Sequence, residues 1–267
     1  MAVQPIKIAI NGAAGRMGQR LIALAAADNQ LKLVAALESP GHERLGADAG
    51  AIAGAGSLGL TLADALPAGA DVVVDFSTPA GTKAILAACQ RQKIPLVVAT
   101  TGLAAEEQAA LRSASEKLPI LWAPSMSFAV NLAMRLTEVA AAALKQHTSG
   151  VDVEIIERHH RYKEDAPSGT ALKFGQIVAS QMGQTDERHG RHGRPGQRPP
   201  TEIGYHALRA GDNPGEHSIV FGMLGETLEI SVAASSRDCY AYGALAAAKF
   251  LAGKPPGMYG MNDVLGL

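Results

Sequence analysis

The sequence has few aromatic residues and almost no net charge. Aromatic residues make up 4% of the 267 residues, and the formal net charge is −1. This balance lacks the basic excess of nucleic-acid-binding domains, and we expect no nucleic-acid partner. No apolar run reaches the roughly 20 residues of a transmembrane helix, so we expect no membrane partner. The first residues show no signal-peptide pattern, and the expected location is the cytoplasm.

Cysteine is also scarce. Cys89 and Cys239 lie far apart, with no metal-binding or redox motif around either. We expect both to be reduced thiols in a cytosolic protein. A dehydrogenase with a catalytic cysteine, such as a semialdehyde dehydrogenase, is disfavoured because Cys89 is expected in the middle of a helix and Cys239 lacks a base motif.

Hydrophobic residues make up 47% of the chain, enough for a substantial core. Short apolar runs alternate with apolar-periodic helices through residue 122, which predicts an α/β fold with a Rossmann-like, doubly wound parallel sheet. The expected strands are residues 6–10, 31–37, 71–76, 96–99 and 120–122. We expect a dinucleotide-binding domain over residues 1–128, to which residues 238–267 return.

A second, α+β domain is expected over residues 129–237, for substrate binding and oligomerisation. Its predicted strands are residues 151–157, 203–209, 217–223 and 227–233, with a tight turn at Gly225-Glu226. They would form a mixed four-stranded sheet with one helix-covered face. Pairing of such sheets between subunits would cover the other face.

A glycine-rich turn follows the first predicted strand. It reads Asn11-Gly12-Ala13-Ala14-Gly15-Arg16-Met17-Gly18, and the second strand ends at Glu38. Glycines at these places suit a tight bend, close approach of a pyrophosphate and close helix–strand packing, and the acid suits a ribose diol. The alternative is an ordinary turn with an unrelated glutamate. The 2′-phosphate of NADPH would need a cation after Glu38, and none is present there. Arg16 in the glycine turn could supply one, so NADH is only slightly favoured over NADPH.

Hydroxyl groups follow the predicted strand 96–99 at Thr100-Thr101-Gly102. The carboxyl end of a central strand is where nicotinamide would lie, although a simple turn explains these residues equally well.

A cluster of titratable residues follows the strand at 151–157. His159, His160, Arg161 and Lys163 precede Ser168-Gly169-Thr170, which opens a helix with Ser168 as its N-cap. Such a helix start offers N–H groups to an anion, so we expect a loop that binds a small carboxylate substrate and transfers a proton. The alternatives are a solvated basic turn and a zinc site. Zinc is disfavoured because adjacent histidines on a strand point to opposite faces, and no metal is expected.

A basic segment spans residues 184–200, with four arginines and two histidines. It is interpreted either as a mobile lid over an anionic substrate or as a solvated loop.

Together these motifs resemble one family, 4-hydroxy-tetrahydrodipicolinate reductase of the diaminopimelate route to lysine. The resemblance covers nearly the whole chain, and its most specific part is the block HHRYKEDAPSGTA. The matching segments are residues 12–18, Glu38, residues 100–102, Asn131, residues 154–171, 191–198, 209–211, 215–217 and 235–237.

The resemblance implies hydride transfer from NADH or NADPH to a cyclic conjugated imine that carries two carboxylates. His159 would be the acid/base residue and Lys163 its partner in proton donation. His160 would contact the substrate, and Ser168, Gly169 and Thr170 would bind a carboxylate. The family also implies a homotetramer built by pairing the substrate-domain sheets. The implied cofactor-binding residues are Gly12, Ala13, Ala14, Gly15, Arg16, Met17, Gly18, Glu38, Thr100, Thr101, Gly102, Ser125 and Phe128.

Three positions depart from the family pattern. Ala99 often is glycine, Ser39 often is arginine, and an asparagine is missing from residues 125–128. The change at Ser39 weakens the case for NADPH. None of the departures touches the segment from His159 to Thr170. A non-catalytic NAD-sensing protein on the same fold is the alternative function, although such a sensor would be expected to lose its proton donors first.

Overall fold

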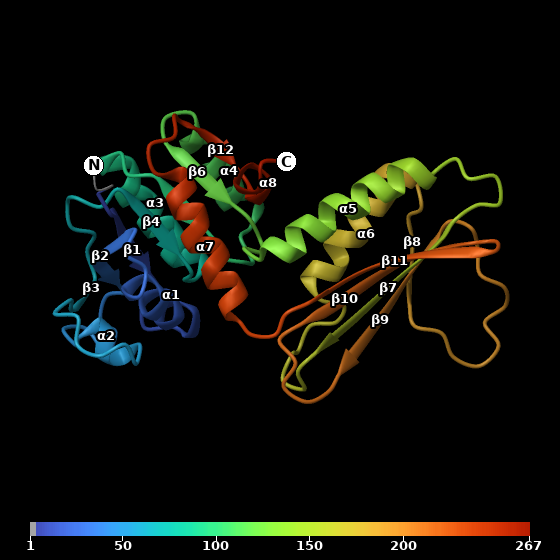
Figure 1. Cartoon of the computed structure of the whole chain (residues 1–267), viewed down its shortest axis with the longest axis horizontal. Helices are drawn as coiled ribbons and strands as arrows, with labels where there is room; N and C mark the ends of the chain where they lie inside the picture. The colour runs from blue at the N-terminus through green and yellow to red at the C-terminus, as the bar shows by residue number, and fades with distance from the viewer. Residues whose placement is uncertain (1–3) are drawn as a thin grey trace. The chain divides into compact units, whose positions relative to one another are not determined.

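The computed structural model describes residues 4–267, which form two compact units. The first unit comprises the described residues up to Phe128 together with Asp238–Leu267, and the second comprises Ala129–Arg237. The first unit thus combines amino-terminal elements, blue to green in Figure 1, with the red carboxy-terminal ones. No helix among the described residues is long and apolar enough to cross a membrane.

The first unit is built on a seven-stranded sheet in which every neighbouring pair is parallel. Its strands are β1 (Ile6–Asn11), β2 (Leu31–Leu37), β3 (Leu62–Ala63), β4 (Val72–Asp75), β5 (Leu96–Val98), β6 (Pro119–Trp122) and β12 (Gly257–Tyr259). Their order is β12-β6-β5-β4-β1-β2-β3, so the chain changes direction across the sheet between β1 and β4. The doubly wound sheet predicted from the sequence is confirmed, and its switch point is where such folds bind ligands.

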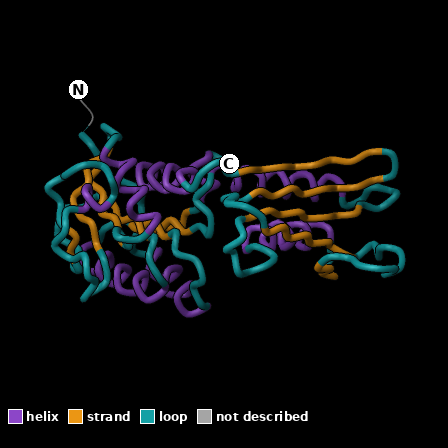
Figure 2. Tube along the Cα trace, turned by 90° about the horizontal axis from the view of Figure 1, so that it is seen from below, coloured by secondary structure: helices purple, strands orange, loops and turns teal. Residues whose placement is uncertain are grey.

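Helices cover both faces of this sheet, as Figure 2 shows. They are α1 (Arg16–Ala26), α2 (Ala49–Ile52), α3 (Pro79–Gln92), α4 (Ala105–Ser115), α7 (Asp238–Leu251) and α8 (Met261–Leu265). Alternate residues of one strand serve the two cores: Ile8 and Ile10 pack with α1 and α7, whereas Ala9 packs with α3 and α4. Burial on both faces explains the continuous apolar runs of these strands.

The second unit contains a mixed sheet of five strands in the order β11-β10-β7-β9-β8. Its strands are β7 (Asp152–His159), β8 (Asp186–His189), β9 (Glu202–Arg209), β10 (Glu216–Met223) and β11 (Glu226–Ala233). β7, β8 and β9 are parallel, whereas β10 is antiparallel to both neighbours.

The expectation of four strands was wrong. The fifth strand, β8, reads Asp-Glu-Arg-His, is fully exposed and lies at the edge beside β9. Neither face of this short, charged edge strand is buried. Its sequence therefore lacks the alternation of apolar and polar residues by which a strand is predicted. The hairpin turn was also misplaced by one residue. Met223 pairs with Glu226, so Leu224 and Gly225 form the turn.

Two helices, α5 (Phe128–Leu144) and α6 (Gly169–Met182), pack on one face of this sheet. The core contains Phe174 of α6, Ile155 of β7 and Phe221 of β10, all without solvent exposure. Because side chains alternate along a strand, the neighbours of Ile155 on β7, Glu154 and Ile156, lie on the opposite, open face.

Candidate functional site

The glycine turn of the first unit has no room for side chains at two positions. Gly12 has φ +79°, and a Cβ there would lie 2.4 Å from the carbonyl oxygen of Phe76. A Cβ on Gly18 would lie 2.1 Å from the oxygen of Gly12. Helix α1 starts directly after Gly15, with no side-chain cap and no acid in its first turn. Its first N–H groups therefore remain suited to a pyrophosphate.

Glu38 lies beside this turn at the end of β2. One carboxylate oxygen accepts a hydrogen bond from Ala14 N at 3.1 Å, and the other accepts one from Ser39 N at 2.9 Å. The acid and the turn are therefore held together, an arrangement suited to a ribose next to a pyrophosphate.

A cavity of about 400 Å³ opens beside the start of α1. It brings together six of the residues expected to bind the cofactor, from the turn and from the ends of two further segments. These six are Gly15, Arg16, Met17, Thr100, Thr101 and Ser125. Gly102 and Phe128 do not line it; Phe128 is half-buried against the core of the first unit. The cavity, the turn and Glu38 together fit a nicotinamide dinucleotide.

Sequence reasoning missed a buried carboxylate under this cavity. Asp75, the last residue of β4, has no solvent exposure and accepts hydrogen bonds from four side chains. The donors are Asn11 at 2.8 Å, Ser77 at 2.6 Å, Thr82 at 2.5 Å and Thr100 at 2.9 Å. Asp75 thereby fixes the hydroxyl groups of Ser77 and Thr100, which line the cavity. The available signal was an acid at the end of an otherwise apolar strand.

In the second unit, His159 is the last residue of β7. The sequence had predicted that it lies in the loop after this strand. Its side chain lies on the helix-covered face, and the residue is only 8% exposed. Its Nδ1 lies 2.5 Å from Oε2 of Glu157, two residues earlier on the same face. Arg209 donates to both oxygens of Glu157, at 2.8 and 2.7 Å, and Ser168 N donates at 3.1 Å.

The charges in this cluster set its protonation states. Burial opposes ionisation of Glu157, but hydrogen bonds from Arg209 and His159 outweigh it, and the pKa of Glu157 lies below its ordinary value. Burial lowers the pKa of His159; Glu157 raises it, and the positive charges of Lys163 and Arg209 lower it, with a net decrease. At neutral pH we therefore expect an ionised Glu157 and a neutral His159.

A second histidine lies against the first. His217 of β10 meets the His159 ring edge-on, with ring centroids 5.2 Å apart. Its Nε2 lies 2.9 Å from Oγ of Ser168, and burial is the main cause that lowers the pKa of His217 to about 4. His217 is therefore neutral at physiological pH and holds the N-cap of α6.

The helix start at α6 is formed as predicted. Ser168 is the N-cap, and its Oγ accepts a hydrogen bond from Ala171 N at 3.2 Å. Ser168 itself is buried, with its N–H bound to Glu157. The N–H groups of Gly169 and Thr170 have no carbonyl of the same helix to bind, and Gly169 is exposed. An anion would therefore meet Gly169 and Thr170 before Ser168.

Lys163 and His160 lie in the loop between β7 and α6. The ammonium of Lys163 donates to both oxygens of Asp165, at 2.7 and 2.9 Å. Nδ1 of His160 is shielded from solvent, with no hydrogen-bond partner among the described residues. No group of three potential ligands in residues 4–267 could hold a metal ion.

Comparisons with known proteins agree over nearly the whole chain. Two family models match, "Dihydrodipicolinate reductase, N-terminus" over residues 6–126 and "Dihydrodipicolinate reductase, C-terminus" over residues 129–265. The chain belongs to the dihydrodipicolinate reductase family. It is 53% identical to the 4-hydroxy-tetrahydrodipicolinate reductase of Rhodopirellula baltica, covering 98% of this chain and 97% of the relative. It is 47% identical to that of Alkalilimnicola ehrlichii, covering 98% and 99%.

Solved structures agree with the fold. The dihydrodipicolinate reductase of Paenisporosarcina sp. TG-14, described as dipicolinate-bound, gives a TM-score of 0.77 at 24% identity, covering 97% of this chain and 99% of that one. The WlbA dehydrogenase of Thermus thermophilus, described in complex with NAD and α-ketoglutarate, gives 0.55 at 16% identity, covering 97% and 91%.

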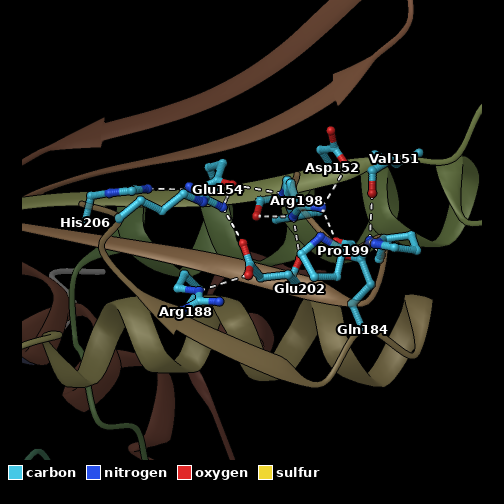
Figure 3. Close-up of polar contacts among 12 residues, drawn as sticks. Val151, Asp152, Glu154, Gln184, Arg188, Arg198, Pro199, Glu202 and His206 are labelled. Atoms are coloured by element: carbon cyan, nitrogen blue, oxygen red, sulfur yellow. Dashed lines mark hydrogen bonds and ion pairs between the residues drawn. The ribbon is translucent and has the colours of Figure 1, made fainter. Parts of the chain in front are cut away.

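In this family member two arginines of the basic segment 184–200 bind carboxylates of the second-unit sheet. Arg191 donates to Glu154 at 2.7 Å and also to Glu202, and Arg198 donates to Glu154 at 3.0 Å. His206 completes the group around Glu154 at 2.7 Å. Figure 3 shows Arg188, Arg198 and His206 gathered around these two carboxylates. Glu154 lies on the open face of the sheet, whereas His159 lies on the helix-covered face.

Proposed function

We propose that this protein is an NAD(P)H-dependent 4-hydroxy-tetrahydrodipicolinate reductase, which forms tetrahydrodipicolinate in the diaminopimelate pathway to lysine. One observation carries the proposal. The family's most specific segment carries a carboxylate-held histidine, a lysine and an open helix start within the residues from His159 to Thr170.

The helix start at Gly169 and Thr170 suits one carboxylate of the substrate. Backbone N–H groups there point outward and carry the positive end of the α6 dipole. Lys163 provides a positive charge in the same loop, and it would exchange Asp165 for the substrate. His160 adds a shielded Nδ1 for which the described part of the chain offers no hydrogen-bond partner. A relative described as dipicolinate-bound supports a planar dicarboxylate as ligand.

His159 and Lys163 would supply the proton. When bound, the reduced nicotinamide cofactor supplies a hydride, and its addition to a conjugated imine leaves negative charge that must be protonated. A dianionic substrate also favours the protonated form of His159, which burial disfavours in the free protein. Substrate binding would thus charge the histidine at the moment when its proton is needed.

The decisive experiment follows oxidation of NADH and of NADPH while the hydroxylated precursor is generated in situ. Turnover with kcat in the usual range of about 1–10³ s⁻¹ supports the proposal. Tight nucleotide binding without turnover, under conditions where the R. baltica relative is active, would rule it out.

NADH is the favoured cofactor, because the residue after Glu38 is uncharged. Ser39 donates its N–H to Glu38 and offers no cation to a 2′-phosphate. Replacing Ser39 with arginine is expected to shift the NADPH/NADH ratio of kcat/KM toward NADPH by about tenfold, a change of about 1.4 kcal/mol. Ser39→Gln is the matched control, since it adds length without charge. An equal shift in both variants would show that size, not charge, sets the preference.

We extend the proposal to a cytoplasmic homotetramer that pairs the open faces of the second-unit sheets. Ile156 and Leu208 are 39% and 48% exposed on that face, where the sheet has no helix to cover them. Sedimentation equilibrium giving the mass of a single chain would refute the tetramer.

A further inference from the structure

The carboxylate of Glu157 has no place among the family residues carried over above, yet it holds His159. It is 1% exposed, and each of its oxygens accepts at least two hydrogen bonds or close contacts. An acid so deeply buried is costly unless its partners are well placed, as they are here. The arrangement indicates a specific task for the acid.

We propose that Glu157 is a positioning residue for the reductase reaction, which holds the Nδ1–H of His159 so that Nε2 is the nitrogen that exchanges a proton with the substrate. The inference rests on the proposed function. An ionised carboxylate accepts hydrogen bonds only, so the nitrogen that faces it must carry the proton. In the neutral ring the lone pair then lies on Nε2.

The surroundings of Nε2 agree with this assignment. Gly215, just before β10, has φ +146°, and a Cβ there would lie 2.8 Å from Nε2 of His159. Glycine at this position therefore keeps a Cβ from pressing on this nitrogen. Nδ1, by contrast, is enclosed by Glu157.

Arg209 connects the two proton-transfer residues. It lies opposite His159 in the pairing of β7 with β9 and binds both oxygens of Glu157. The same guanidinium donates to the carbonyl oxygen of Asp165 at 2.8 Å, and the carboxylate of Asp165 holds Lys163. One arginine therefore fixes the acid behind His159 and the residue that holds Lys163.

The test compares two glutamates on one strand. Glu157→Gln removes the acid behind His159. Glu154→Gln, the control, removes an acid that also binds arginines and a histidine, but on the open face. We expect Glu157→Gln to lower kcat by about 10²-fold, since general acid–base catalysis contributes about 10²–10⁴-fold, and Glu154→Gln to leave kcat within about twofold. Equal losses in the two variants would overturn the proposal.

Two further readouts separate positioning from a structural role. If Glu157 acts through His159, adding Glu157→Gln to His159→Asn lowers kcat little further than His159→Asn alone; additive losses of kcat would contradict this.

The pH profile of kcat is the second readout. His159 faces Glu157 on β7, Arg209 on β9, His217 on β10 and Lys163. Removing the only negative charge among these lowers the pKa of His159, so activity should fall at a lower pH than in the wild type. An unchanged profile would count against the proposal.

The tautomer can be measured without any assay. Solid-state NMR of ¹⁵N-histidine-labelled wild-type protein, with His159→Asn for assignment, should show protonated Nδ1 and unprotonated Nε2 in neutral His159. The opposite tautomer overturns the inference, even if Glu157→Gln does not fold. If the wild type shows the expected tautomer but no turnover, the proposed function fails and the pairing stands. If the wild type turns over and His159→Asn is impaired whereas Glu157→Gln is not, the inference about Glu157 fails and the proposed function stands.

Discussion

Replacing His159 with asparagine is expected to lower kcat by about 10²–10⁴-fold and to leave nucleotide affinity unchanged. The amide nitrogen of asparagine can still donate to Glu157, so the buried carboxylate keeps a partner in place of Nδ1. What the variant lacks is Nε2. Because the glycine turn belongs to the other unit, the dissociation constant of NADH should not move. Steady-state kinetics with fluorescence titration of NADH measures both quantities.

His206→Gln is the control for this substitution. His206 also binds a glutamate, through Nε2 at 2.7 Å from Glu154, and the amide of glutamine replaces that nitrogen. The control should keep kcat within about twofold. A His159→Asn enzyme that retains most of its kcat would show that Lys163 alone delivers the proton. A large rise in KM with unchanged kcat would make His159 a binding residue instead.

The parts of the site that could be predicted are those whose functional residues are consecutive in the chain. The glycine turn can be recognised because its bend, its helix start and its preceding strand are consecutive in the chain. Ser168 was identified as an N-cap for the same reason. Continuous apolar runs such as β4 revealed the parallel sheet, because both of its faces are buried.

The parts that were missed depend on contacts between distant segments. Arg209 binds Glu157 from the neighbouring strand, although the two residues are 52 positions apart in the sequence, and no local pattern predicts that contact. Glu157 itself could have been found, since a residue two positions before His159 on a strand shares its face. The two interpretations of the segment 184–200 stayed open in the sequence because charge alone cannot distinguish a lid from arginines bound to buried acids such as Glu202.

Replacing Gly18 with alanine is expected to weaken nucleotide binding by at least tenfold and to destabilise the first unit by about 1–3 kcal/mol. Helix propensity works the other way, because alanine in α1 would gain about 1 kcal/mol over glycine. The added Cβ, however, would lie 2.1 Å from Gly12 O and 2.7 Å from Ala13 Cα. Both are backbone atoms, so no side-chain rotation relieves the contact and the turn itself must open. Thermal unfolding and NADH titration measure the two effects.

Gly15→Ala separates packing from cofactor approach. A Cβ on Gly15 would meet only Gly12 O, at 3.2 Å, a tight contact that a small shift relieves, so the unfolding temperature should fall much less than in Gly18→Ala. Gly15 nevertheless lines the cavity at the start of α1, and a methyl group there would keep a pyrophosphate from the N–H groups. We therefore expect lost affinity with retained stability, whereas Gly18→Ala loses both. Gly222→Ala, where the nearest atom would be 3.8 Å away, controls for adding a methyl group. If Gly15→Ala binds NADH as the wild type does, the pyrophosphate does not lie at this turn, and the cavity would have to hold the cofactor in another way.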